Sequence, residues 1–354
     1  MNRVRMVIEG IGAVGGFGEG MTALQQAFSG LLVNQDKVSI ETREGTKEIP
    51  AYLAGTDGLF RFFEKKELRR IDHYSRLALL GACLALEDAS RPVHNVGPLG
   101  VIIATGYGPH RTTFSFLDSF IEGGDVFSSP TQFASSVHNA AAAYIGILLH
   151  QTGPSLTVSQ FETSVASGLL TAWSWLEEQR VEAVLLGAVD EYSPVLGYCW
   201  ERLLGPLPGA DVRINPGNFD VQTAIPGEGA AFFVLSCDET RKKRGVVTGV
   251  TASSCHSNEV SIAADNKILI GADGQRNTGR YYKTLPFAET ALCYSHAYGS
   301  VPVGQAFDLA IATLVMSGVC DEQELEATSC KSRAISCVKF GSAGQSGIVQ
   351  IDNN

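Results

Sequence analysis

The sequence GPSLTVSQFETS, which occupies residues 153–164, decides how this chain is expected to fold. A Gly-Pro turn precedes a short run that ends at Val158 and is typical of a strand. Residues 164–178 then have the composition and spacing of a helix. A strand that runs into a helix N-terminus offers free backbone N–H groups and a favourable dipole to an anion. Enzymes often place a nucleophile at such a junction, and here the junction holds Glu162.

This junction lies within a long stretch that is almost free of charge. Residues 126–176 are 51 positions with a single acidic or basic side chain other than histidine, Glu162. At the chain average of 18% charged residues, such a stretch would hold roughly nine. Its purest apolar run, 140–149, is shorter than the ~18–20 residues of a membrane span. We therefore expect central strands and a buried core helix, or a permanent subunit interface.

The composition of the whole chain limits the classes of partner. Among 354 residues, 27 Lys and Arg stand against 37 Asp and Glu, which gives a formal net charge of −10. This balance argues against nucleic acid and against a polybasic membrane anchor, because both need a surplus of basic side chains. The N-terminus does not follow the pattern of a signal peptide, because Glu9 and five glycines interrupt its apolar run.

The cysteines give no support to a zinc site or a disulfide framework, because they are scattered and form no CxxC pair. The eight are Cys83, Cys199, Cys237, Cys255, Cys293, Cys320, Cys330 and Cys337. We expect reduced thiols in a cytoplasmic protein, with no metal and no cofactor.

Strand-like and helix-like segments alternate along the chain, which predicts a layered α/β protein. No linker rich in proline, serine or charge divides it. The expected strands are 4–8, 101–105, 155–158, 184–186, 230–235, 246–250 and 347–351, and the expected helices are 22–28, 71–88, 140–149, 164–178 and 306–316.

The sequence GIGAVG at residues 10–15 matches the GxGxxG pattern of dinucleotide-binding folds. Asp36 follows at the distance where such folds place their ribose acid. However, the helix that would receive the phosphates begins with Gly16, Gly18 and Gly20, and glycine is a poor helix former. We expect a glycine-rich turn from strand to helix instead.

Residues 153–164 resemble the nucleophile segment of the β-ketoacyl synthase family of condensing enzymes, in which the GPS strand leads to the catalytic cysteine. Further blocks are similar to the family in the same order. They are the opening strand and helix at 3–30, the basic segment 65–72, the segment 129–146, the PGEGAA strand entry at 226–235 and the glycine-rich turn FGSAG at 340–344. The resemblance is good over residues 3–240 and patchy over 265–352.

This resemblance implies a thiolase-like α/β fold with five layers, α/β/α/β/α, built from two pseudo-symmetric halves. The N-terminal ketosynthase-like half would span residues 1–240, and the C-terminal half would span residues 241–354.

The resemblance also implies that the catalytic residues have been replaced. The family uses a cysteine thiolate to carry the acyl chain and two histidines to promote decarboxylation and hold the thioester oxyanion. Glu162 falls at the cysteine, Asp273 at the first histidine and His296 at the second, while Ala291 and Ser342 replace a lysine and a phenylalanine. We predict no catalytic role for these degenerate positions, because a carboxylate that attacks a thioester gives a mixed anhydride with no reason to persist.

The pattern resembles the chain length factor of type II polyketide synthases, a subunit that keeps the synthase fold without its cysteine. This implies an active ketosynthase as partner, in a heterodimer or a dimer of heterodimers, and an acyl carrier protein that brings malonyl or polyketide chains. Side chains of the factor would set the depth of a tunnel through the interface. Two alternatives stay open: a malonyl-acyl-carrier-protein decarboxylase that primes a synthase, and a catalytically dead scaffold subunit.

Several residues are candidates for these roles. Glu162 either gains stability at a helix N-terminus, by ~0.3–1 kcal/mol when exposed, and plugs an abandoned pocket, or it supports decarboxylation. His296 is interpreted as a hydrogen-bonded remnant. The candidates for the tunnel or interface are Phe114, Phe116, Phe133 and His138, and those for carrier docking are Lys65, Lys66, Arg69 and Arg70. A second basic cluster at 241–244 is interpreted as a solvated helix end.

Overall fold

The computed structural model describes residues 5–30, 33, 35–94, 96–205, 213–253, 266–288, 290–319 and 333–353. Three of the cysteines discussed above, Cys255, Cys320 and Cys330, lie outside the described residues. Within the described part of the chain, no helix is both long enough and apolar enough to cross a membrane.

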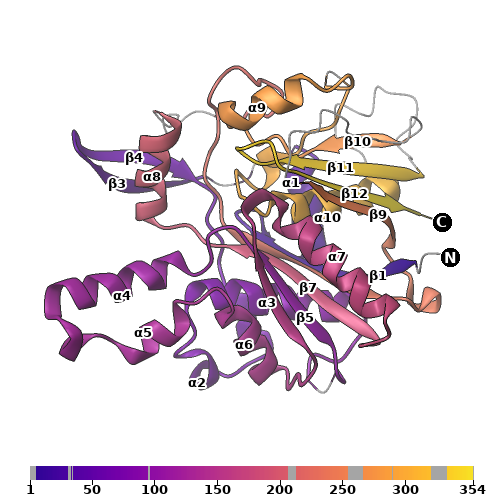
Figure 1. Cartoon of the computed structure of the whole chain (residues 1–354), viewed down its shortest axis with the longest axis horizontal. Helices are drawn as coiled ribbons and strands as arrows, with labels where there is room; N and C mark the ends of the chain where they lie inside the picture. The colour runs from indigo at the N-terminus through magenta and orange to yellow at the C-terminus, as the bar shows by residue number, and fades with distance from the viewer. Residues whose placement is uncertain are drawn as a thin grey trace.

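Ten strands of the described chain form one continuous mixed sheet (Figure 1). Their order is β10-β11-β12-β9-β1-β8-β7-β5-β6, and β2 pairs with β1. The strands span Met6–Gly15 (β1), Gly18–Glu19 (β2), Gly100–Thr105 (β5), Ser155–Ser159 (β6), Ala183–Asp190 (β7), Gly229–Ser236 (β8), Gly245–Ser253 (β9), Lys267–Ile270 (β10), Ala334–Phe340 (β11) and Ser346–Asp352 (β12).

The sheet repeats one pattern of strand pairing in two halves. From β1 outward, two antiparallel pairs (β1–β8 and β8–β7) are followed by two parallel pairs (β7–β5 and β5–β6). From β9 outward, two antiparallel pairs (β9–β12 and β12–β11) are followed by one parallel pair (β11–β10) and then by a single parallel bridge from Leu269 to Leu292. The topology is therefore that of two related halves, joined where β1 pairs with β9 between Met6–Val247 and Ile8–Gly245. The boundary at residue 240 stays a prediction.

Helices lie on both sides of each half of the sheet. α3 (His73–Asp88) and α6 (Ala140–Leu148) pack on the first half, and α9 (Arg276–Lys283) packs on β11 of the second. α7 (Ser164–Glu177) and α10 (Gly304–Met316) contact strands of both halves and form the middle layer. Phe232 of β8 belongs to the core beneath α3, while its neighbour Phe233 belongs to the core around α7 and α10. The predicted α/β/α/β/α order is confirmed.

The segment around β6 is less buried than the sequence predicts. α6 buries Ala141 and Ile145 but leaves Ile147 65% exposed, and Leu156 on β6 is 40% exposed. The prediction of a buried core helix at 140–149 is therefore wrong for one face of α6. β6 is the last strand of the sheet, and no described strand pairs with its outer edge.

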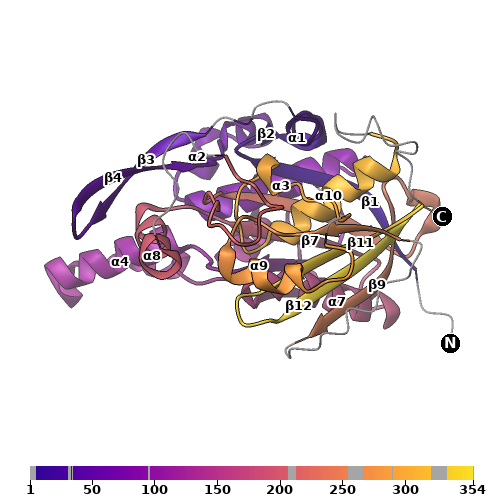
Figure 2. The ribbon, with the colours of Figure 1, turned by 90° about the horizontal axis from the view of Figure 1, so that it is seen from above.

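Two protrusions at one end of the molecule were not predicted (Figures 1 and 2). One is a helical arm, which comprises α4 (His110–Gly123), η2 (Asp125–Phe127) and α5 (Pro130–Ser135). The other is the hairpin of β3 (Asp36–Thr42) and β4 (Gly45–Ala51), which packs on α8 (Pro194–Leu204). Ile40, Ile49 and Trp200 form the buried centre of that second protrusion.

The GIGAVG motif lies inside β1, so the predicted glycine-rich turn at 10–15 is wrong. The turn comes later, at Gly16 and Phe17, before α1 (Gly20–Phe28). Gly12 faces α3, where an added Cβ would be 2.2 Å from the carbonyl oxygen of Gly81 and 2.4 Å from the nitrogen of Ala85. The motif allows a helix to pack closely on a strand and forms no phosphate-binding turn.

The basic cluster at 241–244 lies at the end of a short helix, and Arg241 and Lys243 are exposed, which agrees with its interpretation as a solvated helix end. Lys242 and Arg244 are half-buried and also bind neighbouring segments. It follows β8 through η4 (Glu239–Arg241) and leads into β9. Arg244 forms an ion pair with Asp88 at the end of α3, and Lys242 Nζ donates to the carbonyl oxygen of Asn353 at 2.6 Å. These contacts fasten the junction between the halves of the sheet.

The close packing of β1 on α3 gives a testable prediction. Gly12→Ala is expected to lower the free energy of unfolding by about 3 kcal/mol, because its methyl group meets helix backbone that cannot move aside. Urea denaturation measures the change. Gly55→Ala is the control, because a Cβ there meets nothing within 4 Å, and it should shift stability by no more than ~0.5 kcal/mol. Equal stability of the two variants would contradict the packing argument.

Candidate functional site

Glu162 lies in η3 (Phe161–Thr163), the turn that leads from β6 into α7. Ser164 fixes this turn: its hydroxyl accepts from the Gln160 N–H at 2.7 Å and donates to the carbonyl oxygen of Thr105 at 2.8 Å. η3 packs against β11 and β12, so it lies at the glycine-rich turn between those strands. A Cβ on Gly341 would be only 3.0 Å from Oε2 of Glu162. The glycine therefore leaves room for the carboxylate.

The groups around Glu162 shift the pKa of its carboxyl in opposite directions. Burial raises the pKa of this carboxyl above its ordinary value. A hydrogen bond from its own backbone N–H and the nearby charge of Lys339 act in the opposite direction, while Asp273 adds to the rise.

Asp273 is paired with a lysine that the sequence analysis did not single out. Nζ of Lys339, on β11, lies 3.2 Å from Oδ2 of Asp273 and donates to the carbonyl oxygen of Gly271 at 2.8 Å. The same Asp273 oxygen accepts from the Ser300 hydroxyl at 2.8 Å and from Nε2 of Gln275 at 3.2 Å. Lys339 is only 1% exposed. We call Glu162, Asp273, Lys339 and Asp308 the charge cluster.

Asp308 of α10 completes this cluster. Its Oδ1 accepts a hydrogen bond from the Tyr298 hydroxyl at 2.6 Å, while its Oδ2 is buried without a hydrogen-bond partner. Burial raises the pKa of Asp308 to about 7, and the hydrogen bond from Tyr298 and the charge of Lys339 limit the rise. Asp308 therefore changes its charge near neutral pH.

His296 lies in η5 (Ser295–Ala297), half-buried, with its ring 6.1 Å from the ring of Tyr294. Ser300, four residues further on, connects this segment to Asp273. The role of His296 as a remnant stays a prediction.

The candidate tunnel residues lie on and beside the arm. Phe114 and Phe116 are on α4, and Phe133 is on α5. The rings of Phe116 and Phe133 meet at 5.3 Å, so the structure brings these two together. His138 is exposed and borders Gly108, where an added Cβ would be 2.6 Å from its ring. All four face solvent at least in part, so they can line a tunnel only beside another molecule.

The candidate docking residues lie in and directly after α2 (Lys65–Leu68). Lys65, Lys66, Arg69 and Arg70 are all exposed. Lys66 pairs with Glu64 at 2.8 Å on the surface, a contact that contributes little to stability.

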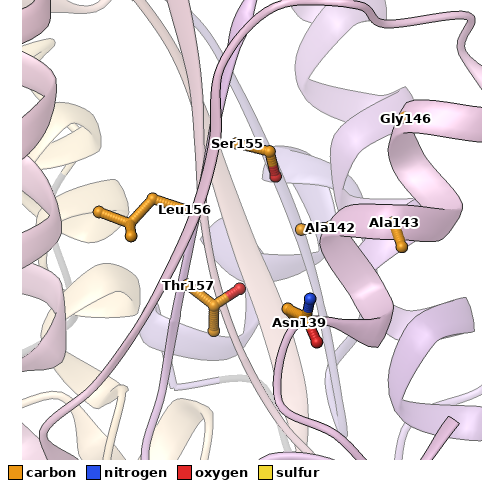
Figure 3. Close-up of a pocket in the computed structure, with 7 residues that line it drawn as sticks. All are labelled: Asn139, Ala142, Ala143, Gly146, Ser155, Leu156 and Thr157. Atoms are coloured by element: carbon orange, nitrogen blue, oxygen red, sulfur yellow. The ribbon is translucent and has the colours of Figure 1, made fainter. Parts of the chain in front are cut away.

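A shallow hollow of about 490 Å³ lies between α6 and β6 (Figure 3). Small residues line its helical side, and Ser155, Leu156 and Thr157 line its strand side. It follows the open edge of the sheet and is separate from the charge cluster. Among the described residues, no group of three or more His, Cys, Asp or Glu side chains is arranged to hold a metal ion.

Comparisons with known proteins agree with this geometry. Residues 62–202 match the family described as beta-ketoacyl synthase, N-terminal domain. The chain is 26% identical over 253 residues to 3-oxoacyl-[acyl-carrier-protein] synthase 2 of Staphylococcus aureus, and 26% identical over 184 residues to the enzyme of that name from Mycobacterium bovis. This chain is similar to β-ketoacyl synthases over these residues. The Staphylococcus alignment covers 68% of this chain and 60% of the relative, so the chain spans about three fifths of that curated enzyme.

Solved ketosynthase structures share the fold over almost the whole chain. A type II polyketide synthase acyl-carrier protein in complex with its ketosynthase matches with a TM-score of 0.74 and 18% identity, covering 99% of this chain and 100% of the other. A ketosynthase in complex with its chain length factor from Xenorhabdus doucetiae matches with a TM-score of 0.76 and 13% identity, covering 99% and 98%. These likenesses confirm the thiolase-like fold.

The Lys339–Asp273 pair gives a second prediction. Lys339→Met is expected to lower the free energy of unfolding by about 3–5 kcal/mol, because it leaves a buried carboxylate without its counter-charge. Adding Asp273→Asn to the Lys339→Met variant should restore part of the lost free energy of unfolding, as measured by urea denaturation. Lys283→Met is the matched control, because Lys283 pairs with Asp220 on the surface, and it should cost no more than about 1 kcal/mol. Equal losses in the two single variants would refute a special role for the buried pair.

Asp308 gives a third prediction, on pH. Its pKa is about 7 in the folded chain and ~3.9 in the unfolded chain, so unfolding releases a proton between these values. The free energy of unfolding should therefore fall as pH rises from about 4 to about 7, by an amount on the order of 4 kcal/mol at most. Asp308→Asn should remove this contribution and be more stable than wild type at pH 8. Urea denaturation at pH 5 and pH 8 measures it, and equal pH dependence in both proteins would contradict the assignment.

Proposed function

We propose that this chain is a non-condensing subunit of a type II polyketide synthase, a chain length factor that pairs with an active ketosynthase and shapes the tunnel for the growing chain. The observation that carries the proposal is the charge cluster at the position of the family's nucleophile. Glu162 stands at the helix N-terminus, and Lys339 neutralises Asp273 where the resemblance expects a histidine.

This arrangement is unsuited to Claisen condensation. The reaction needs a thiolate that accepts the acyl chain and donors that hold the thioester oxyanion. Here residue 162 is a glutamate with no thiol, and the Lys339 ammonium is engaged by Asp273 and Gly271. The fold is kept while the reacting groups are replaced.

The decarboxylase alternative receives less support. A malonyl group brings a carboxylate of its own, which must enter the pocket with its negative charge. The charge cluster already holds three carboxyl groups against one ammonium, so a further carboxylate would meet repulsion in a poorly solvated place. The scaffold alternative differs only in whether the subunit changes product length, which the experiment below decides.

An exposed surface without charge supports a paired subunit. Apolar side chains along α5, α6, β6 and α7 are exposed, and Glu162 is the one acidic or basic residue other than histidine among residues 126–176. Ser135 and Tyr144 hydrogen-bond at 3.2 Å and connect α5 to α6, and α6 and α7 both contact β6. We call this surface the uncharged face: Phe133, Val137, Ile147, Leu156 and Leu170. Such a face beside an unpaired strand edge is typical of an interface that another subunit covers.

The proposal also includes a docking segment for the acyl carrier protein. Lys65, Lys66, Arg69 and Arg70 project from one exposed segment of an otherwise acidic chain. An acidic carrier protein would be attracted to them. We assign this segment to carrier docking as part of the proposal.

Reconstitution tests the function. The chain is combined with a ketosynthase of the same organism that has the catalytic cysteine, its acyl carrier protein and malonyl units, and the acyl-carrier products are weighed by mass spectrometry. Phe116→Ala, which removes the ring that meets Phe133, is expected to shift the products to longer chains, because a shortened side chain deepens the tunnel. Leu203→Ala on α8, exposed and away from the arm, is the control and should leave the products unchanged.

Two results would overturn the proposal. Full activity of the ketosynthase without this chain would exclude an obligatory partner. Unchanged product length in Phe116→Ala and Phe133→Ala, with activity that still requires the chain, would favour the scaffold.

A further inference from the structure

The helical arm is attached to the rest of the molecule with very little burial. Of the 14 residues of α4, only His110 at its start is buried. The helix packs mainly on η2 and α5, which belong to the same arm, and the arm projects away from the central sheet (Figure 1). Apolar burial positions most helices of a globular protein, but it cannot fix the direction of a helix with one buried residue. The contacts at its start therefore decide how the arm is held.

Glu191 provides the contact at the start of α4. It follows the last residue of β7 and is 1% exposed. Its Oε1 accepts a hydrogen bond from the backbone N–H of Arg111 at 2.9 Å. Nη2 of Arg111 donates to the carbonyl oxygen of Tyr192 at 2.8 Å. The first turn of α4 is thus bonded twice to the segment that joins β7 to α8.

The bond from Arg111 to Glu191 replaces a local helix cap. The first N–H groups of a helix have no partner within the helix, and a side chain at the N-cap position usually accepts from one of them. The N-cap of α4 is Pro109, whose side chain forms no such bond. Glu191 takes this role from 80 residues further along the chain.

The second oxygen of Glu191 makes no comparable contact. Oε2 is buried without a hydrogen-bond partner, which costs free energy. The nearby charges of Asp72 and Glu228 also oppose ionisation of this carboxyl group. An apolar side chain would avoid both costs and would lose the bond to Arg111. The bond to α4 is therefore what this buried carboxyl group contributes.

We propose that Glu191 is the positioning residue for the arm, because its carboxyl group caps α4 and so sets the direction in which the arm leaves the body. Phe114 and Phe116 follow Arg111 by three and five residues on the same helix, so a change at its start moves both rings. The effect on product length rests on the proposed function, in which these rings shape the tunnel. Glu191 acts there through the arm, without touching the growing chain.

Hydrogen–deuterium exchange of the isolated chain at pH 5 tests the positioning. Glu191→Ala removes the cap, and peptides from residues 110–123 are expected to exchange about 5-fold faster, as the typical loss of a helix cap implies. Glu191→Gln retains an oxygen that can accept from Arg111 and should exchange like wild type. Glu182→Ala is the matched control, because Glu182 is exposed and directly precedes the opposite end of β7. Peptides from α10 should exchange alike in all four proteins, which excludes general unfolding.

The groups around Glu191 make this contact sensitive to pH. Burial raises the pKa of its carboxyl to about 8, and the charges of Asp72 and Glu228 add to the rise. The hydrogen bond from the Arg111 N–H and the charge of its side chain act in the opposite direction. The titratable and charged groups near this carboxyl come from the starts of α3 and α4, the entry to β8 and the end of β7: Asp72, His73, His110, Arg111, Glu228 and Asp190.

The pH dependence is a readout that a contact without a titrating group would not give. When the arm detaches, Glu191 enters water, where its pKa is ~4.3. Because the pKa is higher in the attached state, detachment should become easier as pH rises from about 4 to about 8. The ratio of exchange rates between wild type and Glu191→Gln cancels the titration of the other groups, which both proteins share. This ratio should rise by about 10-fold or more between pH 5 and pH 8.

The outcomes separate this inference from the proposed function. Unchanged exchange of residues 110–123 in Glu191→Ala, a glutamine variant that exchanges like the alanine variant, or a ratio that does not change with pH would overturn the positioning role. In the reconstituted synthase, Glu191→Ala should shift the products to longer chains and Glu191→Gln should restore the wild-type length. If Glu191→Ala speeds the exchange of the arm while it and Phe116→Ala both leave product length unchanged, the positioning stands and the proposed control of chain length fails.

Discussion

The buried pair of Lys339 and Asp273 is the interaction around which the charge cluster is organised. Neither charge can be removed from water at low cost without the other, so the pair constrains everything that contacts it. Asp273 accepts hydrogen bonds from Ser300 and Gln275, and Lys339 donates a hydrogen bond to the carbonyl oxygen of Gly271. β11 continues from Lys339 into the glycine-rich turn, where Gly341 lies against Glu162. The charge cluster thus connects β11, α10 and the turn before α7.

The fold and the charge cluster are supported by different parts of the sequence. The core around α7 and α10 is apolar and contains none of the replaced residues. The backbone at the end of β6 is fixed by Ser164 and Thr105, which do not depend on the side chain at residue 162. Under the proposed function, the chain could therefore carry a carboxylate in place of a nucleophile and keep the strand edge and the uncharged face for a paired subunit. In the proposed complex, the chain contributes a binding surface for the ketosynthase and no condensing activity.

Much of the fold and part of the site could be predicted from the sequence. The strand before Glu162, the helix after it and the layered α/β order follow from local periodicity, and the structure confirms them. Lys339 was missed because one charged residue in the strand AISCVKF gives no sign of its partner, which is 66 residues away. Asp308 was missed because a single acidic residue within an apolar helix gives no sign of the groups that surround it in the folded chain. The prediction of a glycine-rich turn at 10–15 was wrong, because Gly12 allows β1 to pack closely on α3. That helix lies about 70 residues further along the chain, so no local pattern shows the contact.

By itself, the sequence determined that a carboxylate, Glu162, stands at a strand–helix junction, and that the stretch around it carries no other acidic or basic side chain except histidine. Both are local facts, set by residue type and order. Only the tertiary structure decided that the uncharged stretch is partly exposed along an open strand edge, because burial depends on which strands pair. Only the tertiary structure, too, showed that Lys339 neutralises Asp273 and that Phe161 is held in a left-handed conformation. Distances between remote residues and backbone angles at a turn are consequences of packing, which no local pattern contains.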